Sequence, residues 1–269
     1  MKKVSKVFVV LTYRNTSDLK TFLNENSFSD SKIVVVNSFY DENSREEFQA
    51  IANNNNCDFI NVANRGYGAG NNAGVDFALK NYDFEHLIIC NPDVKINKFD
   101  DAYLKKMGTR VILAPEIKTK TGKDQNPFII NYNYFFRWLY YKAVTNKFTF
   151  LKYFVYAVNG LVRRLFIKFV TGLGLDKARV YSCHGSFFII GKQALSELAP
   201  LYYEEMFLYH EEHFLARKTA LKEIPIYFVP KYFSIKHYED GSTFFNNKIM
   251  NDYLDDSYIK FFKFYYRNF

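Results

Sequence analysis

A carboxylate placed just after a buried strand is the first candidate for chemistry in this sequence. The apolar run at 87–89 predicts a strand covered on both faces. Pro92 has no N–H to give to a sheet, so we expect the strand to end near Asn91 and to leave Asp93 just beyond its carboxyl end. Ligands bind at this edge of open α/β sheets, where a carboxylate can hold a cation and the cation a diphosphate. Taken alone, the Asn-Pro-Asp stretch favours a plain turn.

Two adjacent acids, Glu211 and Glu212, open a predicted helix that runs to about residue 221. An ionised carboxylate at such a position can accept a proton from a substrate hydroxyl. Favourable charge at a helix N-terminus explains the pair equally well. His237 follows a strand-like segment at 233–237, where it is either a structural histidine or a metal ligand.

A glycine-rich stretch at 64–74 contains Gly66, Gly68, Gly70 and Gly74. Glycines allow the backbone to approach a ligand closely. The spacing is not the dinucleotide-binding fingerprint, and the stretch follows the third predicted strand rather than the first. A turn that leads into a helix explains it almost as well.

The elements that must position these residues alternate along the chain. Apolar runs predict strands at 4–11, 33–37, 57–62, 87–91, 111–114, 187–190, 224–229 and 233–237. Between the early strands, helices are expected at 16–24, 44–53 and up to about 81, with later ones at 193–198, 211–221 and 243–268. Alternating strands and helices indicate an α/β protein with a mainly parallel sheet.

The composition suits one large α/β unit that contains an inserted basic lobe. The chain has 269 residues, of which 48% are hydrophobic, so it can bury a sizeable core. The three cysteines are widely spaced and predict neither a disulfide framework nor a zinc site. The apolar run after the N-terminal lysines is too short for a signal peptide, and no uncharged run could span a bilayer. We therefore expect a cytoplasmic protein.

The net charge of +8 is concentrated in one segment. Residues 117–180 contain twelve Lys and Arg but two acids, with aromatic residues interleaved, and the tail at 260–267 repeats this pattern. Basic and aromatic residues mixed on helices suit an anionic membrane surface. Ordinary amphipathic helices with a solvated basic face are nearly as good an interpretation, and nucleic acid is the least favoured partner.

A likeness to a known family is carried by segments that stand in the family's order: Val9–Asn15, Asn64–Gly74, Asn91–Asp93, His184–Phe188, Tyr209–Glu212 with Arg217, and His237 with Gly241 and Ser242. Together they resemble the family 2 inverting glycosyltransferases of the GT-A fold. The closest likeness is to the rhamnosyltransferase-like branch that builds bacterial surface polysaccharides. It covers nearly the whole chain.

The resemblance implies a Rossmann-like, mainly parallel sheet flanked by helices, with a basic aromatic helical insertion at about 131–172. It divides the chain into a nucleotide-sugar-binding half at 1–115, an acceptor-binding half at 116–242 and a basic aromatic C-terminal helix at 243–269.

Site residues follow from the same resemblance. Asp93, with His237 as a second ligand, would bind Mn²⁺ or Mg²⁺, and Glu212 or its neighbour Glu211 would be the catalytic base. The nucleotide sugar would contact Thr12, Tyr13, Arg14, Asn37, Asp41, Gly66, Tyr67, Gly70, Asn71 and Asn91. The acceptor would contact His184, Gly185, Tyr209 and Arg217.

Two positions depart from the family pattern. Asn37 stands where the family usually has an aspartate that contacts the base of the nucleotide, and Asp41 or Glu42 could take over that contact. Glu212 stands where the catalytic residue is usually an aspartate, which keeps the chemistry and changes the reach of the side chain.

The implied reaction moves rhamnose or another hexose from a UDP- or dTDP-sugar to a hydroxyl of a lipid-linked oligosaccharide, with inversion, in capsule or cell-wall polysaccharide synthesis. The enzyme would lie at the inner face of the cell membrane, on an anionic surface, without nucleic acid. The sequence is compatible with an oligomer. The competing hypothesis is a catalytically inactive GT-A domain that binds sugars or serves as a scaffold.

Overall fold

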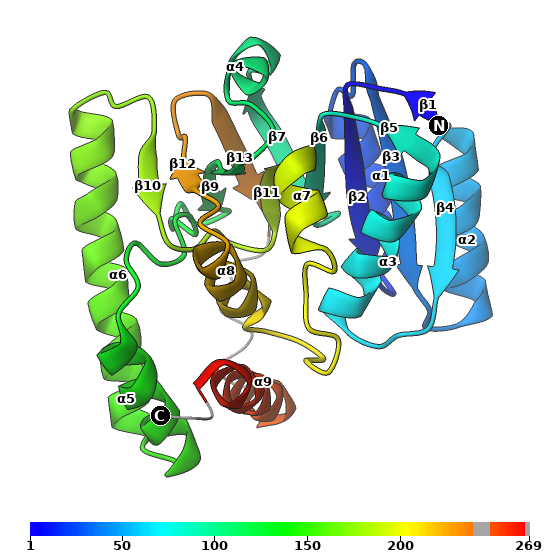
Figure 1. Cartoon of the computed structure of the whole chain (residues 1–269). Helices are drawn as coiled ribbons and strands as arrows, with labels where there is room; N and C mark the ends of the chain where they lie inside the picture. Colours follow the sequence, from blue (N-terminus) through cyan, green and yellow to red (C-terminus); the bar gives the residue numbers. More distant parts are fainter. Residues whose placement is uncertain (239–247, 267–269) are drawn as a thin grey trace.

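A computed structural model describes residues 1–238 and 248–266 (Figure 1). Within residues 1–115 the elements are β1 (Lys2–Lys3), β2 (Lys6–Thr12), α1 (Thr16–Glu25), β3 (Ser31–Ser38), α2 (Glu42–Asn54), β4 (Asp58–Val62), α3 (Tyr67–Asn81), β5 (Tyr82–Asp83), β6 (His86–Cys90), β7 (Val94–Phe99), α4 (Asp101–Lys106) and β8 (Ile112–Ala114). The remainder are β9 (Glu116–Thr119), α5 (Tyr134–Thr145), α6 (Thr149–Gly172), β10 (Ala178–Val180), β11 (Phe187–Gly191), α7 (Lys192–Leu198), α8 (Glu211–Leu221), β12 (Ile226–Phe228), β13 (Phe233–His237) and α9 (Lys248–Tyr266).

The main sheet has the strand order β10-β12-β8-β11-β6-β2-β3-β4. Strands β6, β2, β3 and β4 are parallel, as the alternating pattern predicts. β11 runs antiparallel to both β6 and β8, and β10 runs antiparallel to β12, so the sheet is mixed. The α/β class is confirmed.

The apolar strands form because both faces of the sheet are covered. In β2, Val7 and Val9 pack into one core with α3 and α7, and Phe8 and Val10 pack into the other with α1, α2 and α4. Successive side chains of a strand point to opposite faces, so a continuous apolar run fills both cores. Figure 1 shows α3 and α7 on the near face of the sheet.

A second sheet of three strands lies next to the main one in the order β7-β13-β9. β13 pairs antiparallel with β7 and parallel with β9. The sequence pattern predicted β13 and missed β7 and β9, because β7 carries lysines and β9 is only four residues long. In this sheet His237 lies opposite Val94, the residue after Asp93.

The predicted basic insertion contains α5 and α6, which pack against each other. The C-terminal helix α9 packs on α5 and α8, and its Tyr258, Phe261, Phe262 and Tyr266 are buried there. Three aromatics of the predicted basic tail, Phe261, Phe262 and Tyr266, thus lie in a third apolar core, whereas Phe264 is 52% exposed. Within residues 1–238 and 248–266, no helix combines the length and hydropathy that crossing a bilayer requires.

Candidate active site

The predicted metal ligands Asp93 and His237 lie together. Asp93 Oδ2 is 3.2 Å from His237 Nε2. The pairing of β7 with β13 brings them there, and the Tyr238 N–H donates to the Asp93 carbonyl oxygen across the same strands. The His237 ring is buried, whereas the Asp93 side chain retains 21% of its exposure. The pair therefore sits at the boundary between protein and solvent, where a ligand can reach it.

Gln125 orients the His237 ring, and sequence reasoning missed it. Its Oε1 lies 2.7 Å from His237 Nδ1 and accepts that N–H. Nε2 then faces the Asp93 carboxylate. Metal-binding histidines usually donate their other N–H in this way. Nothing in the sequence near Gln125 signals this role, because its partner is 112 residues away.

The arrangement fits a divalent cation. One carboxylate oxygen and one imidazole nitrogen are suitable ligands for Mn²⁺, and substrate phosphates and water commonly complete such sites. Among residues 1–238 and 248–266 no group of three or more His, Cys, Asp or Glu side chains gathers into a metal site. A cation at Asp93 and His237 would thus depend on the diphosphate for further ligands.

Glu212 is connected to the strand that precedes Asp93. Its Oε1 accepts the backbone N–H of Gly185 at 3.1 Å, and the Gly185 carbonyl accepts the Tyr67 hydroxyl at 2.8 Å. That hydroxyl lies 3.2 Å from Asn91 Oδ1. A Cβ at Gly185 would lie 2.9 Å from Glu212 Oε1, so the absence of a side chain lets the carboxylate approach. Hydrogen bonds thus connect Tyr67, Asn91, Gly185 and Glu212.

Glu211 is the more deeply buried of the two acids. Its side chain keeps 5% of its exposure, and its Oε1 has no hydrogen-bond partner among the described residues. Burial raises the pKa of Glu211 well above its ordinary value, and the neighbouring Glu212 raises it further. Burial also raises the pKa of Glu212, although the Gly185 N–H opposes this effect. Two adjacent carboxyls with raised pKa values are typical of a functional site.

The backbone before α8 is strained. Tyr209 and His210 have φ angles of 72° and 66°, the left-handed region that costs non-glycine residues about 1 to 3 kcal/mol each. His210 is the residue that precedes the helix. This turn sets the direction in which Glu211 and Glu212 leave the chain. The predicted acceptor residue Tyr209 therefore has a role in the backbone turn.

A row of polar side chains lies at the carboxyl ends of β2, β3 and β4. Thr12 pairs with Asn37, and Asn37 with Asn61. Asn37 is fully buried, and its Nδ2 donates to Asn61 Oδ1 at 2.7 Å. Its Oδ1 has no partner among the described residues, which leaves an acceptor for a ligand donor. The predicted contact of Asn37 with the nucleotide base would be made by this Oδ1 atom.

Tyr13 and Arg14 lie beside this row, in contact with Tyr40. The Arg14 guanidinium lies over the Tyr40 ring at 4.2 Å, and the Tyr13 and Tyr40 rings are 5.7 Å apart, edge to face. Both tyrosines are exposed. The Arg14 guanidinium and the two tyrosine rings are flat, exposed groups that can stack on a nucleotide base.

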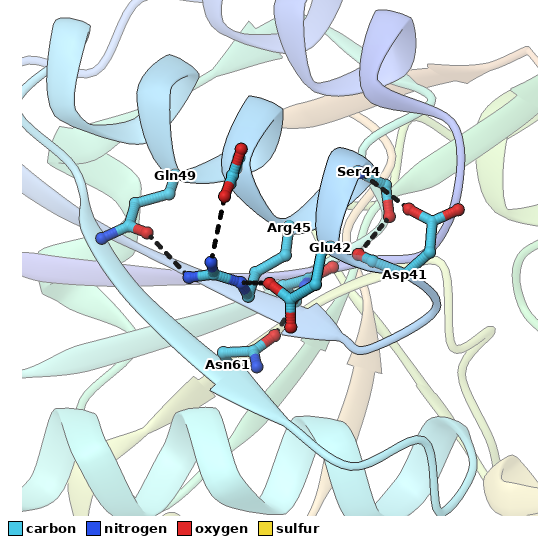
Figure 2. Close-up of polar contacts among 8 residues, drawn as sticks. Asp41, Glu42, Ser44, Arg45, Gln49 and Asn61 are labelled. Atoms are coloured by element: carbon cyan, nitrogen blue, oxygen red, sulfur yellow. Dashed lines mark hydrogen bonds and ion pairs between the residues drawn. The ribbon is translucent and has the colours of Figure 1, made fainter.

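Asp41 caps α2, as Figure 2 shows. Its carboxylate accepts the Ser44 N–H at 2.8 Å, and this bond lowers its pKa. On the same helix Arg45 forms an ion pair with Glu42, and its Nη1 lies 3.4 Å from Gln49 Oε1 (Figure 2). The sequence predicted that this helix starts at Ser44. It starts two residues earlier, at Glu42, because the Asp41 carboxylate accepts a backbone N–H that would otherwise lack a partner at the helix N-terminus. A base contact at Asp41 would compete with this cap.

Most of the glycine-rich stretch, from Tyr67 onward, is helical. α3 begins at Tyr67, and a Cβ at Gly70 would lie 2.5 Å from Leu11 Cδ1. At Gly66, where φ is 104°, a Cβ would lie 2.2 Å from the Phe207 carbonyl oxygen. The glycines therefore let α3 pack closely on β2 and on the chain before α8. Gly66 and Gly70, which were predicted to contact the nucleotide sugar, thus pack against other parts of the protein.

Two predicted ligand contacts have partners within α3 and within the segment before β11. Asn71 is buried, and its Nδ2 donates to the Tyr67 carbonyl. His184 Nδ1 lies 2.8 Å from Ser186 Oγ, and its ring centroid is 6.0 Å from that of His237. Burial lowers the pKa of His184 to about 3, so the ring is neutral. His184 thus links the metal pair to Gly185 and Glu212.

Arg217 does not join this cluster by any contact that the structure describes. Its guanidinium lies over the rings of Tyr132 and Tyr266, at 5.0 and 5.6 Å from their centroids. It therefore ties α8 to α9 and to the chain before α5. The element with Gly241 and Ser242 lies outside the described residues.

Comparisons with known proteins bear on the fold. No family model matches the chain. A hexosyltransferase of low-salt glycan biosynthesis from Haloferax volcanii, Agl10, is 28% identical over 122 residues, which are 44% of this chain and 38% of the relative. The chain thus spans well under half the length of that relative.

Solved structures share the fold at low sequence identity. GalNAc-T7, crystallised with UDP, GalNAc and Mn²⁺, matches 88% of this chain and 44% of its own, with 13% identity and a TM-score of 0.58. TarS of S. aureus matches 98% of this chain and 44% of its own, with 13% identity and a TM-score of 0.54. The chain has the GT-A glycosyltransferase fold. In this GT-A domain the candidate residues lie at the carboxyl ends of the parallel strands, where such sheets bind ligands.

Proposed function

We propose that this GT-A protein is an inverting, metal-dependent glycosyltransferase that uses a nucleotide-diphosphate sugar. The observation that carries the proposal is the proximity of two groups of different chemistry. His184 lies beside His237 of the Asp93 pair, and the next residue, Gly185, donates its N–H to Glu212. The proposed cation ligands and the proposed carboxylate base thus lie on either side of residues 184–185. A metal-assisted displacement at an anomeric carbon uses both kinds of group.

The steps follow from the side chains. Tyr13, Arg14, Tyr40 and Asn37 would bind the nucleotide, and Asp93 and His237 would hold the cation. When bound, the cation neutralises the charge that develops on the leaving diphosphate. Glu212 takes the proton of an acceptor hydroxyl as its oxygen attacks the anomeric carbon and the bond to the diphosphate breaks. One displacement from the opposite face inverts the configuration.

Similar proteins support the substrate class. TarS residues 1–349 were crystallised with UDP-GlcNAc, and that structure matches 87% of this chain and 59% of its own with 15% identity and a TM-score of 0.50. Agl10 is a hexosyltransferase of glycan biosynthesis. We propose a UDP- or dTDP-hexose, including rhamnose, as donor and a lipid-linked saccharide as acceptor.

Thermal unfolding in the presence of nucleotide sugars tests the donor. With Mn²⁺ and the correct sugar at about 100 times its Kd, ligand binding should raise Tm by roughly 5 to 10 °C. The control is the same sugar with EDTA. If no UDP- or dTDP-sugar raises Tm with Mn²⁺, the proposal is wrong; binding without release of the nucleoside diphosphate to any acceptor would favour the inactive scaffold.

An exposed apolar stripe on α6 supports contact with a membrane. Its members recur at helical spacing and keep half or more of their exposure: Leu161, Leu165, Phe169 and Leu173. Residues four apart lie on one helix face. Arg164 and Lys168 are exposed next to them. A helix with an apolar stripe and flanking cations suits an anionic lipid surface.

Charge introduced into this stripe should weaken membrane binding. Leu165→Glu with Phe169→Glu is expected to reduce binding to vesicles that contain anionic phospholipid by about 10-fold or more, because two apolar side chains are lost and two like charges added. Vesicle co-sedimentation measures this. Leu221→Glu on α8, at an equally exposed leucine, is the matched control. Equal binding of the double variant and the control would disprove the role of the stripe.

A further inference from the structure

A cavity separate from the candidate active site lies between the inserted helices α5 and α6 and the helices α8 and α9. Its volume is about 420 Å³, within the range of ligand pockets. Figure 1 shows α5 and α6 along one side of the molecule, with α8 and α9 facing them. Most of the wall is apolar or aromatic, including Phe128, Phe136, Tyr140, Val155 and Val162.

The charged groups in the wall are all basic. Arg137 and Arg163 line the cavity together with His210 and His213, and none of the described lining residues is an aspartate or glutamate. Arg137 keeps only 5% of its exposure. Its Nη1 lies 2.8 Å from His213 Nδ1, a neutral partner. A buried guanidinium without a carboxylate carries a charge that the cavity does not balance.

Two guanidinium donors in this wall have no partner. Arg137 Nε and Arg163 Nε are buried without a hydrogen bond to any described residue. Leaving such groups unsatisfied costs about 1 to 3 kcal/mol each, and more when they are charged. A ligand with several anionic oxygens would satisfy them, and Arg pairs readily with phosphate.

We propose that this cavity binds the phosphate end of a long-chain lipid phosphate, with the hydrocarbon chain against its aromatic and aliphatic wall. The naming of this lipid as part of the glycosyl acceptor rests on the proposed function. The binding itself does not. The bound lipid phosphate is the acceptor lipid and not a phospholipid of the bilayer.

The place of the cavity in the fold suits an acceptor. His210 lines it and directly precedes Glu211 and Glu212. Phe128 also lines it, and its ring is 6.0 Å from the ring of His184. A lipid phosphate held here would therefore place an attached sugar next to the candidate base.

The cavity lies next to the apolar stripe of α6. Val162 lines the cavity and is also 44% exposed, and it follows Leu161 of the stripe in sequence. The stripe and the cavity wall thus lie on neighbouring faces of one helix.

Calorimetric titration of the whole protein with farnesyl phosphate tests the proposal. Gly160 lines the cavity on α6, and a Cβ there meets nothing within 4 Å. Gly160→Leu should weaken farnesyl phosphate by about 10-fold or more by filling the cavity, and leucine favours the helix over glycine. Gly172→Leu is the matched control, on the same helix and equally open, but outside the cavity.

Changes of charge test the phosphate contact. Arg163→Met should weaken farnesyl phosphate by about 10-fold, whereas Arg179→Met, at an exposed arginine on β10 outside the cavity, should leave it unchanged. Wild-type protein should bind farnesol and inorganic phosphate each at least about 10-fold more weakly, because each lacks half of the ligand. Equal affinity for farnesol, or equal effects of the variants and their controls, would overturn the proposal.

A comparison of two lipid phosphates distinguishes an acceptor lipid from a bilayer phospholipid. Tighter binding of farnesyl phosphate than of dihexanoyl phosphatidic acid supports an acceptor lipid, and the reverse order overturns that assignment. Melting with Mn²⁺ and nucleotide sugars on the same variants separates the two hypotheses. A retained donor shift with lost lipid binding in Gly160→Leu shows the cavity acting apart from the donor site. Lipid binding without any donor shift would refute the proposed function and leave the cavity intact.

Discussion

Replacing Glu212 by glutamine is expected to lower kcat for sugar transfer by about 10² to 10⁴-fold, with the Kd of the nucleotide sugar little changed. The amide keeps the shape of the side chain, including an oxygen that can accept the Gly185 N–H, but it cannot take a proton from the acceptor. Steady-state kinetics of nucleoside diphosphate release, in parallel with donor binding, measures both quantities.

Glu211→Gln is the matched control, since it removes the neighbouring carboxyl. It should retain most of the transfer activity. If Glu211→Gln is the inactive variant and Glu212→Gln the active one, the base is Glu211 and the assignment is reversed.

The pH dependence gives the same prediction a second readout. Burial raises the pKa of Glu212 above its ordinary 4.5, and a base must be ionised to act, so activity should rise with pH through the raised pKa. The sign for stability is opposite. A carboxyl with a raised pKa stabilises the fold fully below about pH 4.5, and this contribution is lost as pH rises through the folded-state pKa.

Replacing Asp93 by asparagine is expected to abolish the Mn²⁺-dependent rise in Tm with nucleotide sugar and to lower transfer by about 10² to 10³-fold. The change removes the negative charge that faces His237 Nε2 at 3.2 Å. Melting curves with Mn²⁺ and with EDTA measure the effect. The difference between the two conditions should vanish in the variant.

Asp18→Asn provides the control for Asp93. Burial raises the pKa of Asp18, and the charge of Asp93 raises it further, so the two carboxylates lie in one region. No contact between Asp18 and His237 is described, and its replacement should leave the Mn²⁺ effect in place. If both variants lose the effect equally, a general acidic surface holds the cation and the Asp93–His237 site is wrong.

Several features of the site could be predicted from local pattern. The apolar runs of β2, β3, β6 and β11 predict strands because both faces of these strands are buried, which the sequence shows directly as unbroken apolar residues. Asp93 beyond β6 and the acids at the start of α8 follow from a proline and from charge. These signals lie within a few residues of the elements they mark.

Other features were missed or misread because they depend on contacts between distant segments. The glycines of α3 look alike in sequence whether a ligand or another element lies against them, and only the packing on Leu11 and Phe207 shows which. The aromatic tail suggested a membrane surface, but α9 buries Phe261, Phe262 and Tyr266 on α5 and α8 and leaves Phe264 exposed. The exposed apolar stripe is on α6 instead.

The sequence by itself determined the α/β class, the buried strands, the position of Asp93 beyond a strand and that of Glu211 and Glu212 at the start of a helix, because side-chain burial and helix or strand termination are local properties. Only the tertiary structure decided that Gln125 orients His237 and that His237 faces Asp93. That outcome depends on β13 pairing with both β7 and β9, which joins residues 112 positions apart. The pairing of strands is set by the packing of the whole sheet, and no local pattern encodes it.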